Sequence, residues 1–508
     1  MSRRTFATFA ILAVVVSGAV GVQAAPLTCT ANAGVPPIVR VEGTAEPLAD
    51  FTLLCTGGTA TAPGLPVPQV NFTLSLTTNL TSKKTATGFN EALLLVDEPN
   101  SVLSPGVPVL NCGDHGAPDN GGSGPGVCEI IGTGIPTTTY NGTANGFGTA
   151  VCDGLLGHPA PNSYTCGRPN IFQGRPTTPP AVNTVEFKGV PFDPPGAGTR
   201  IFRFTNLRGD GAALGLGPGG TPVAIHMLIT ITGSVSVSVT SPDQVVGFTE
   251  RGLVFTVPAP TPGTSIVRVT EGFASSFKTK NLSFTLGNGG PGNATFSGTN
   301  YVYNGNTLYP ADLAQNVPGT IYNSESGEEW RNNGVNGPPS PNPPLGYGVS
   351  SVPDIGNPFF SAGFGGVNTN IAMAGIANQG TRIALDFTSV PAGHHVIVPE
   401  VVHLHRVGSP AVNSGVLVLT KTNTAGRGAF NRTSAGASIP AGDFAVYEVL
   451  WADPFSVEYA DIPCTLVGGG LGAGIHVSVS FAPFYPGAPP ANPPIPRFRP
   501  AVSSLTLF

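Results

Sequence analysis

Strict alternation of apolar and polar residues constrains this chain more than any other feature of its sequence. The alternation runs through Phe72–Leu76, Ser234–Val239 and Ile475–Phe481. A period of two places apolar side chains on one face of a strand and polar side chains on the other, as in antiparallel sheets with one solvated face. Beyond the first 24 residues, no long segment has the period of an amphipathic helix. The sequence therefore predicts an all-β protein.

The composition suits many short strands joined by tight turns. The chain contains 69 glycines and 52 prolines, and 40% of its residues are hydrophobic, which is enough for packed cores. Charged residues make up only 10%, whereas disordered chains are usually richer in charge and poorer in apolar residues. The formal net charge is −5 and no basic cluster is present, so no nucleic-acid partner is expected.

The first 24 residues have the pattern of an export signal. A pair of arginines precedes an apolar run from Phe6 to Val20, and Ala24 ends a small-residue cleavage site. The run is too short for a good membrane span. We therefore expect a signal peptide over residues 1–24 and a mature chain that is secreted, periplasmic or at the cell surface, without a transmembrane segment. Ser2–Phe6 also fits the start of a twin-arginine signal, so both export routes stay open.

Seven cysteines all lie in the expected mature chain. In an oxidising compartment, they indicate disulfides with one thiol left over. Six cysteines allow 15 pairings, and short sequence separation favours pairing neighbours. No C-x2-C spacing is present, which argues against a zinc ribbon. The expected bridges are Cys29–Cys55, Cys112–Cys128 and Cys152–Cys166, with Cys464 free.

Two stretches of the chain echo each other. Ile38–Ala45 resembles residues 266–274, and later Gly198–Ile201 recurs as Gly380–Ile383 in the same order. This order predicts two tandem antiparallel β-sandwiches, immunoglobulin-like or jelly-roll-like; chance similarity in a biased composition is the alternative. The expected domains cover residues 26–258, with a Cys/Gly-rich insertion near 111–180, and residues 259–484, followed by a Pro-rich tail over residues 485–508.

Histidines near residue 400 form the best candidate site. His403 and His405 alternate along one strand and share a face, as an H-x-H metal pair requires. Glu400, His394 and His395 are further candidate ligands, but Pro399 interrupts the strand between them. Because spacing does not fix a third ligand, a polar strand face without metal is the preferred interpretation. No G-x-S-x-G, H-E-x-x-H or P-loop motif is present, so neither catalytic residues nor a cofactor are predicted.

Several phrases carry a resemblance to a known group of proteins. They are Cys29 with Ile38–Gly43 and Cys55–Thr59, then Glu91–Pro99, Gly198–Asn206, Ala445–Leu450 and Ile495–Phe498. These phrases resemble uncharacterised secreted β-rich proteins of Acidobacteria of the Solibacter type, which implies export and β-rich modules but no catalytic residues. The stretch from Cys29 to Leu76 is also similar to the start of spore-coat-U-like and pilin-type domains. That similarity implies a bridge between the first two strands of an immunoglobulin-like sandwich.

Together these features predict a non-enzymatic structural, adhesive or binding protein of the bacterial cell exterior. Its expected partners are neighbouring surface proteins or glycans. The alternative is an extracellular hydrolase acting on polysaccharide, metal-assisted through residues 394–405 or dependent on a pair of carboxylates.

Overall fold

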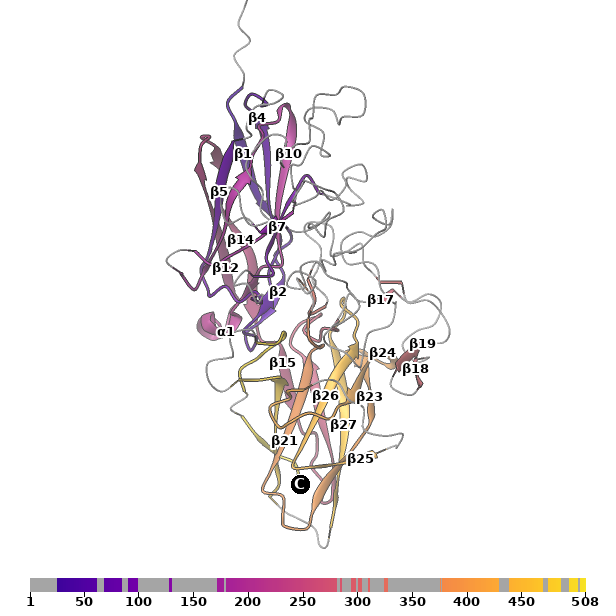
Figure 1. Ribbon diagram of the computed structural model, residues 1–508. Helices are drawn as coiled ribbons and strands as arrows, with labels where there is room; N and C mark the ends of the chain where they lie inside the picture. The colour runs from indigo at the N-terminus through magenta and orange to yellow at the C-terminus, as the bar shows by residue number, and fades with distance from the viewer. Residues whose placement is uncertain are drawn as a thin grey trace, which may run out of the picture.

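The computed structural model describes most of the chain outside the signal and the Cys/Gly-rich insertion. The described residues are 25–61, 68–84, 90–98, 171–177, 180–280, 324–327, 375, 377–428, 438–468, 474–485, 493–500 and 503–508, with short strands at 128–129, 284–285, 294–297, 300–303 and 309–310. Strands dominate these residues, which confirms the predicted β class. The described residues form two large hydrophobic cores. The first consists of residues between positions 27 and 246 of the chain, and the second of residues between positions 253 and 507. Figure 1 shows the two sheet systems one above the other.

Two sheets surround the first core. The strand order is β13-β1-β4-β10-β6-β8-β7 in the seven-stranded sheet and β2-β14-β12-β5-β9 in the five-stranded sheet. The first sheet comprises β13 (Ser238–Thr240), β1 (Thr28–Ala33), β4 (Phe51–Gly57), β10 (Gly196–Thr205), β6 (Leu93–Val96), β8 (Ile171–Gln173) and β7 (Cys128–Glu129). The second comprises β2 (Ile38–Arg40), β14 (Asp243–Glu250), β12 (Val223–Gly233), β5 (Gln69–Leu76) and β9 (Thr184–Pro191).

Alternation along β5 shows why these strands form. Val70, Phe72, Leu74 and Leu76 are buried, and the residues between them are partly exposed. The Phe72 ring packs between the sheets, with centroids 5.1 Å from the Phe202 ring and 5.4 Å from the Phe204 ring. Such aromatic contacts add to the free energy gained by removing apolar area from water.

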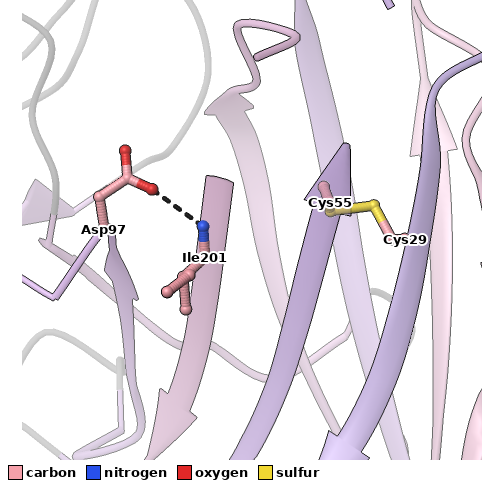
Figure 2. The surroundings of a disulfide bond; sticks show 4 residues. All are labelled: Cys29, Cys55, Asp97 and Ile201. Atoms are coloured by element: carbon pink, nitrogen blue, oxygen red, sulfur yellow. Dashed lines mark hydrogen bonds between the residues drawn. A yellow bond between two sulfur atoms is a disulfide. The ribbon is translucent and has the colours of Figure 1, made fainter. Parts of the chain in front are cut away.

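The predicted Cys29–Cys55 bridge is present in the first half. Cys29 and Cys55 lie directly opposite each other on the antiparallel strands β1 and β4, and Figure 2 shows the bond between them. On the far side of β4, the Ile201 backbone N–H of β10 donates to Asp97 Oδ1 over 2.9 Å, which fixes the end of β6 against β10 (Figure 2).

The remaining cysteines are described only in part. Cys464 is a free, buried thiol on β27, and burial raises the pKa of this thiol to about 12. Cys112, Cys152 and Cys166 lie outside the described residues, and only the strand position of Cys128 is described. The bridges Cys112–Cys128 and Cys152–Cys166 therefore stay predictions.

The second half is one strongly curved sheet. Its strands follow the order β15-β16-β27-β23-β24-β26-β21-β28-β29. β22 pairs with β27, β25 pairs with β22, and β15 contacts β28 near the other end of the path. The sequence predicts a second two-sheet sandwich here, but the strands form a single hydrogen-bonded path around one core. They are β15 (Leu253–Thr256), β16 (Thr264–Glu271), β27 (Glu458–Val467), β23 (Val401–Arg406), β24 (Ser409–Leu419), β26 (Phe444–Trp451), β21 (Arg382–Thr388), β28 (His476–Ala482), β29 (Leu505–Thr506), β22 (His395–Pro399) and β25 (Ser438–Gly442).

The first pair of echoing segments does not have equivalent strand pairing. Ile38–Arg40 forms an edge strand paired in parallel with β14, whereas β16 lies between β15 and β27 in antiparallel pairing. β10 and β21 each have two antiparallel neighbours. The similarity of Ile38–Ala45 to residues 266–274 therefore does not extend to strand pairing, because β2 is a parallel edge strand and β16 an internal antiparallel strand.

Small elements complete the described structure. β3 (Glu46–Pro47) pairs with β11 (Arg208–Gly209), and one turn of helix, α1 (Gly211–Leu214), is capped by the Asp210 side chain. Two short hairpin-like pairs join β17 (Phe284–Thr285) to β20 (Tyr309–Pro310) and β18 (Ala294–Ser297) to β19 (Asn300–Tyr303). Among the described residues, no helix has both the length and the apolar character needed to cross a membrane.

Candidate functional site

The histidines near residue 400 are split between two strands. His395 on β22 lies opposite Val467, and His405 on β23 lies opposite Tyr459, so the two histidines face positions eight residues apart on β27. At the rise of an extended strand, that separation is about 26 Å. Pro399 ends β22, and buried Glu400 lies between the strands. The fold therefore does not bring the five candidate ligands to one point.

His403 and His405 share one half-buried face of β23. The His405 ring lies beside the Tyr459 ring, with a centroid distance of 5.7 Å. Burial lowers the pKa of His403, and the nearby charge of His405 lowers it further. The Nδ1 atom of each histidine is buried and has no hydrogen-bond partner in the described part of the chain. A metal-binding histidine ordinarily donates its other ring N–H to a carboxylate, carbonyl or water, and the Nδ1 atoms of these two make no such bond within the described residues.

We expect the purified protein to contain no stoichiometric zinc or copper at this face. A zinc site needs three or four ligands at about 2.0–2.2 Å, and no group of three or more His, Cys, Asp or Glu side chains among the described residues is arranged to hold a metal ion. Elemental analysis of the desalted protein checks this, with the His403→Ala/His405→Ala variant as control. Stoichiometric metal that is lost in the variant would contradict the prediction and favour the hydrolase alternative.

A buried polar junction connects the two halves, and no motif in the sequence predicts it. Its centre is Arg40 at the end of β2, whose side chain is fully buried. The guanidinium donates to Glu46 within the first half, with Nη2–Oε1 at 2.8 Å. It also donates to Thr381 Oγ1 over 2.9 Å and to Ser276 O over 3.0 Å, both beyond the first core.

Glu325 completes the pairing of Arg40. Its Oε1 lies 2.8 Å from Arg40 Nη1 and accepts the Thr381 hydroxyl over 2.6 Å. Burial alone would lower the pKa of Arg40, but Glu325 and Glu46 together raise it above its ordinary value. The cation also lies over the Phe498 ring, 4.7 Å from its centroid. Arg40 is thus held charged by residues 6 and 285 positions away along the chain.

A second arginine extends the junction. Arg208 Nε donates to Glu91 over 2.8 Å, and its Nη2 donates to the backbone oxygen of Glu325 over 2.7 Å. Glu91 Oε2 also accepts the Gly375 N–H over 3.2 Å. Lys278 is buried within the same region, where burial and then the charge of Arg40 lower its pKa to about 8. The junction therefore concentrates buried charged groups, and some of their hydrogen bonds and ion pairs form only while the two halves are in contact.

The C-terminal segment packs into this junction. The Thr44 N–H donates to Arg497 O over 2.9 Å, and Arg497 Nη2 donates to Thr81 O over 3.0 Å. Phe498 is buried in the second core, and Ile495 packs with Ala45. Burial and then Arg208 lower the pKa of Arg497 to about 10. The described part of the predicted Pro-rich tail thus contacts the first half directly.

Local sequence offered one signal for the junction. Arg40 stands within a run of β-branched residues, where a charged side chain is unusual on a strand with a buried face. The same pattern recurs at Arg268, which is partly exposed and pairs with Asp461 over 2.7 Å. The pattern therefore could not tell a buried junction from a surface ion pair.

Comparisons with known proteins do not assign the chain to a family. No family model matches it, and no curated protein matches it. A solved structure described as BspA_C_mut matches with 8% sequence identity and a TM-score of 0.22, covering 90% of this chain and 94% of that chain. A likeness with so low a TM-score supports no conclusion about the fold or the function of this chain.

Proposed function

We propose that this chain is an exported, non-enzymatic structural or binding component of the bacterial cell exterior. In this proposal, its two tandem β-domains act as one rigid body. The observation that carries it is the buried junction, in which Arg40 pairs with Glu46 and Glu325 and donates to Thr381. Moving the halves apart would break the contacts of Arg40 with Glu325, Thr381 and Ser276, and hydrogen bonds to a charged group contribute about 1.5–3 kcal/mol each. A body that transmits force or presents a surface at a distance needs such a joint.

The surface chemistry supports contact with uncharged partners. The outer face of β1 and β4 carries no charged residue, and its cross-strand pairs are Thr28–Thr56, Thr30–Leu54 and Asn32–Thr52. Hydroxyl and amide groups on an outer sheet face suit hydrogen bonding to neutral glycans or to neighbouring proteins. The Cys29–Cys55 bridge is consistent with an oxidising compartment outside the cytoplasm.

Labelling of intact cells tests the location. We expect a membrane-impermeant biotin reagent to label the protein on whole cells, while a cytoplasmic marker stays unlabelled until lysis. An Arg3→Lys/Arg4→Lys variant separates the export routes, because twin-arginine export needs the arginine pair and the general secretory route accepts lysine. Retention of the unprocessed wild-type chain in the cytoplasm would overturn the proposal.

The hydrolase alternative is tested separately on the purified protein. We expect no release of reducing ends from a panel of soluble polysaccharides above that of a heat-denatured sample. Catalytic turnover would contradict a non-enzymatic role and would redirect attention to the carboxylates of the second half.

A further inference from the structure

Two buried glutamates lie side by side where β16 ends and β27 begins. Glu271 is the last residue of β16 and Glu458 the first of β27, and their exposed fractions are 2% and 0%. Glu271 Oε2 accepts the Glu458 backbone N–H over 2.9 Å. Glu271 Oε1 accepts the Phe277 N–H over 2.7 Å. The pair lies at the edge of the second core, next to the junction around Arg40, because Ser276 accepts from Arg40 through its backbone oxygen and donates to Glu271 through its hydroxyl.

No cation neutralises this pair directly. In the described part of the chain, neither Glu271 nor Glu458 forms an ion pair with lysine or arginine. The charges of Asp453, in the loop before β27, and of Arg406 on β23 act on Glu458, and Arg406 pairs with Asp453 over 2.8 Å. Ser414 on β24 lies beside Glu458, and Ser276 Oγ lies 3.5 Å from Glu271 Oε1. Beyond these groups, Arg40 and Lys278 belong to the junction.

Burial makes two carboxylates at this place unfavourable. Burial raises the pKa of Glu271 well above its usual range, and the charge of Glu458 raises it further. Burial also raises the pKa of Glu458 to about 7. The Ser414 hydroxyl and the Asp453 N–H lower the pKa of Glu458 but do not offset the effect of its burial. The two groups titrate as a coupled pair.

The pair anchors an exposed apolar loop. Glu458 Oε2 accepts the Asp453 N–H over 2.9 Å, and Asp453 Oδ1 accepts the Phe455 N–H over 3.0 Å. The Phe455 side chain is 77% exposed at the tip of this loop, and Val407 on the neighbouring hairpin is 58% exposed. The Val407 N–H donates to Val457 O over 2.9 Å. The Glu458 carboxyl group therefore fixes the backbone of the loop of residues 452–457 through the Asp453 N–H.

We propose that the Glu271–Glu458 pair is a proton-dependent latch that holds loop 452–457 closed in acid and loosens it as the pH approaches neutrality. Loss of the Glu458 proton to solvent leaves a carboxylate in a buried place beside Glu271. The Glu458 side chain then gains by moving toward water, and the Asp453 N–H loses its acceptor. The Phe455 tip becomes mobile while the strands stay paired. This latch is independent of the proposed function.

Hydrogen exchange of peptides covering residues 452–458 tests the latch. Exchange is measured on the full chain from pH 5 to pH 8.5 and corrected for intrinsic rates. The open loop exposes Glu458 with an ordinary pKa, so protection should fall by roughly tenfold per pH unit between about pH 5 and pH 7 and level off above it. In Glu458→Gln, whose amide cannot ionise, protection should not change with pH.

Asp461→Asn is the matched control. Asp461 lies on the same strand, partly exposed and paired with Arg268, so this variant should keep the wild-type profile. Glu271→Gln removes the other ionisable group but keeps Glu458, so the fall should persist in this variant, which keeps the test decisive if Glu458→Gln does not fold. Protection that is independent of pH in the wild type, an unchanged profile in a folded Glu458→Gln variant, or loss of the fall in a folded Glu271→Gln variant would overturn the latch.

Discussion

Replacing Arg40 by methionine will lower the free energy of unfolding by about 3–5 kcal/mol, the usual effect of removing one partner from a buried ion pair. Methionine fills much of the same space but cannot donate to Glu46, Glu325 or Thr381. Both carboxylates then remain buried with their main cation missing. Because Arg40 joins the two halves, their unfolding transitions should also separate. Urea unfolding followed by circular dichroism measures both effects.

Arg268→Met is the matched control for this prediction. Arg268 stands at the same place in the repeated Ile-Val-Arg-Val sequence, and its side chain is 42% exposed. It pairs with Asp461 and lies over the Tyr459 ring, with 4.7 Å to the ring centroid. An exposed pair of this kind contributes about 1 kcal/mol or less. Equal losses of stability in the two variants would show that the junction does not depend on the buried charge.

Removing the Cys29–Cys55 bridge will also destabilise the protein strongly. The bridge joins residues 26 positions apart, and the loop-closure relation gives about 3.5 kcal/mol for such a loop. Both sulfurs lie in the first core, where Cys29 is 1% and Cys55 0% exposed. The Cys29→Ala/Cys55→Ala variant should therefore unfold at a lower urea concentration than the oxidised wild type.

Reductant provides the control for the bridge. It should lower the stability of the wild type toward that of the double variant and leave the first half of the variant unchanged. Non-reducing peptide mapping should recover Cys29 linked to Cys55. A bridge from Cys464 to any other cysteine would contradict both the free, buried thiol on β27 and the separate cores of the two halves.

The strands were predictable where their pattern is local. Phe72–Leu76 and Ile475–Phe481 alternate in sequence, and they lie in β5 and β28 with alternate side chains buried, although Ile475 precedes the first residue of β28. Ser234–Val239 is only partly a strand, because β13 begins at Ser238. Its valines still pack partly buried against the first core. Alternation therefore located the buried faces better than the strand ends.

The candidate site was less predictable than the strands. His403 and His405 share a face, as their spacing indicates. His395 lies on β22, which pairs with the opposite end of β27 from the end that pairs with His405. Pro399 separates these strands along the chain, and the distance between them follows from their register on β27. The proximity of Glu271 and Glu458 could not be predicted from the sequence, since they are 187 positions apart and neither lies in a motif.

The sequence by itself determined the β class, the approximate position of many strands and the Cys29–Cys55 bridge. Each of these depends on a period of two or on cysteines close together in the chain. Only the tertiary structure decided that Arg40 is buried and Arg268 exposed, although the two share the same neighbours in sequence. The physical reason is that the state of a charge depends on the groups that surround it in space. For Arg40, Glu325 and Thr381 are 285 and 341 positions away, and no local pattern can place them beside it.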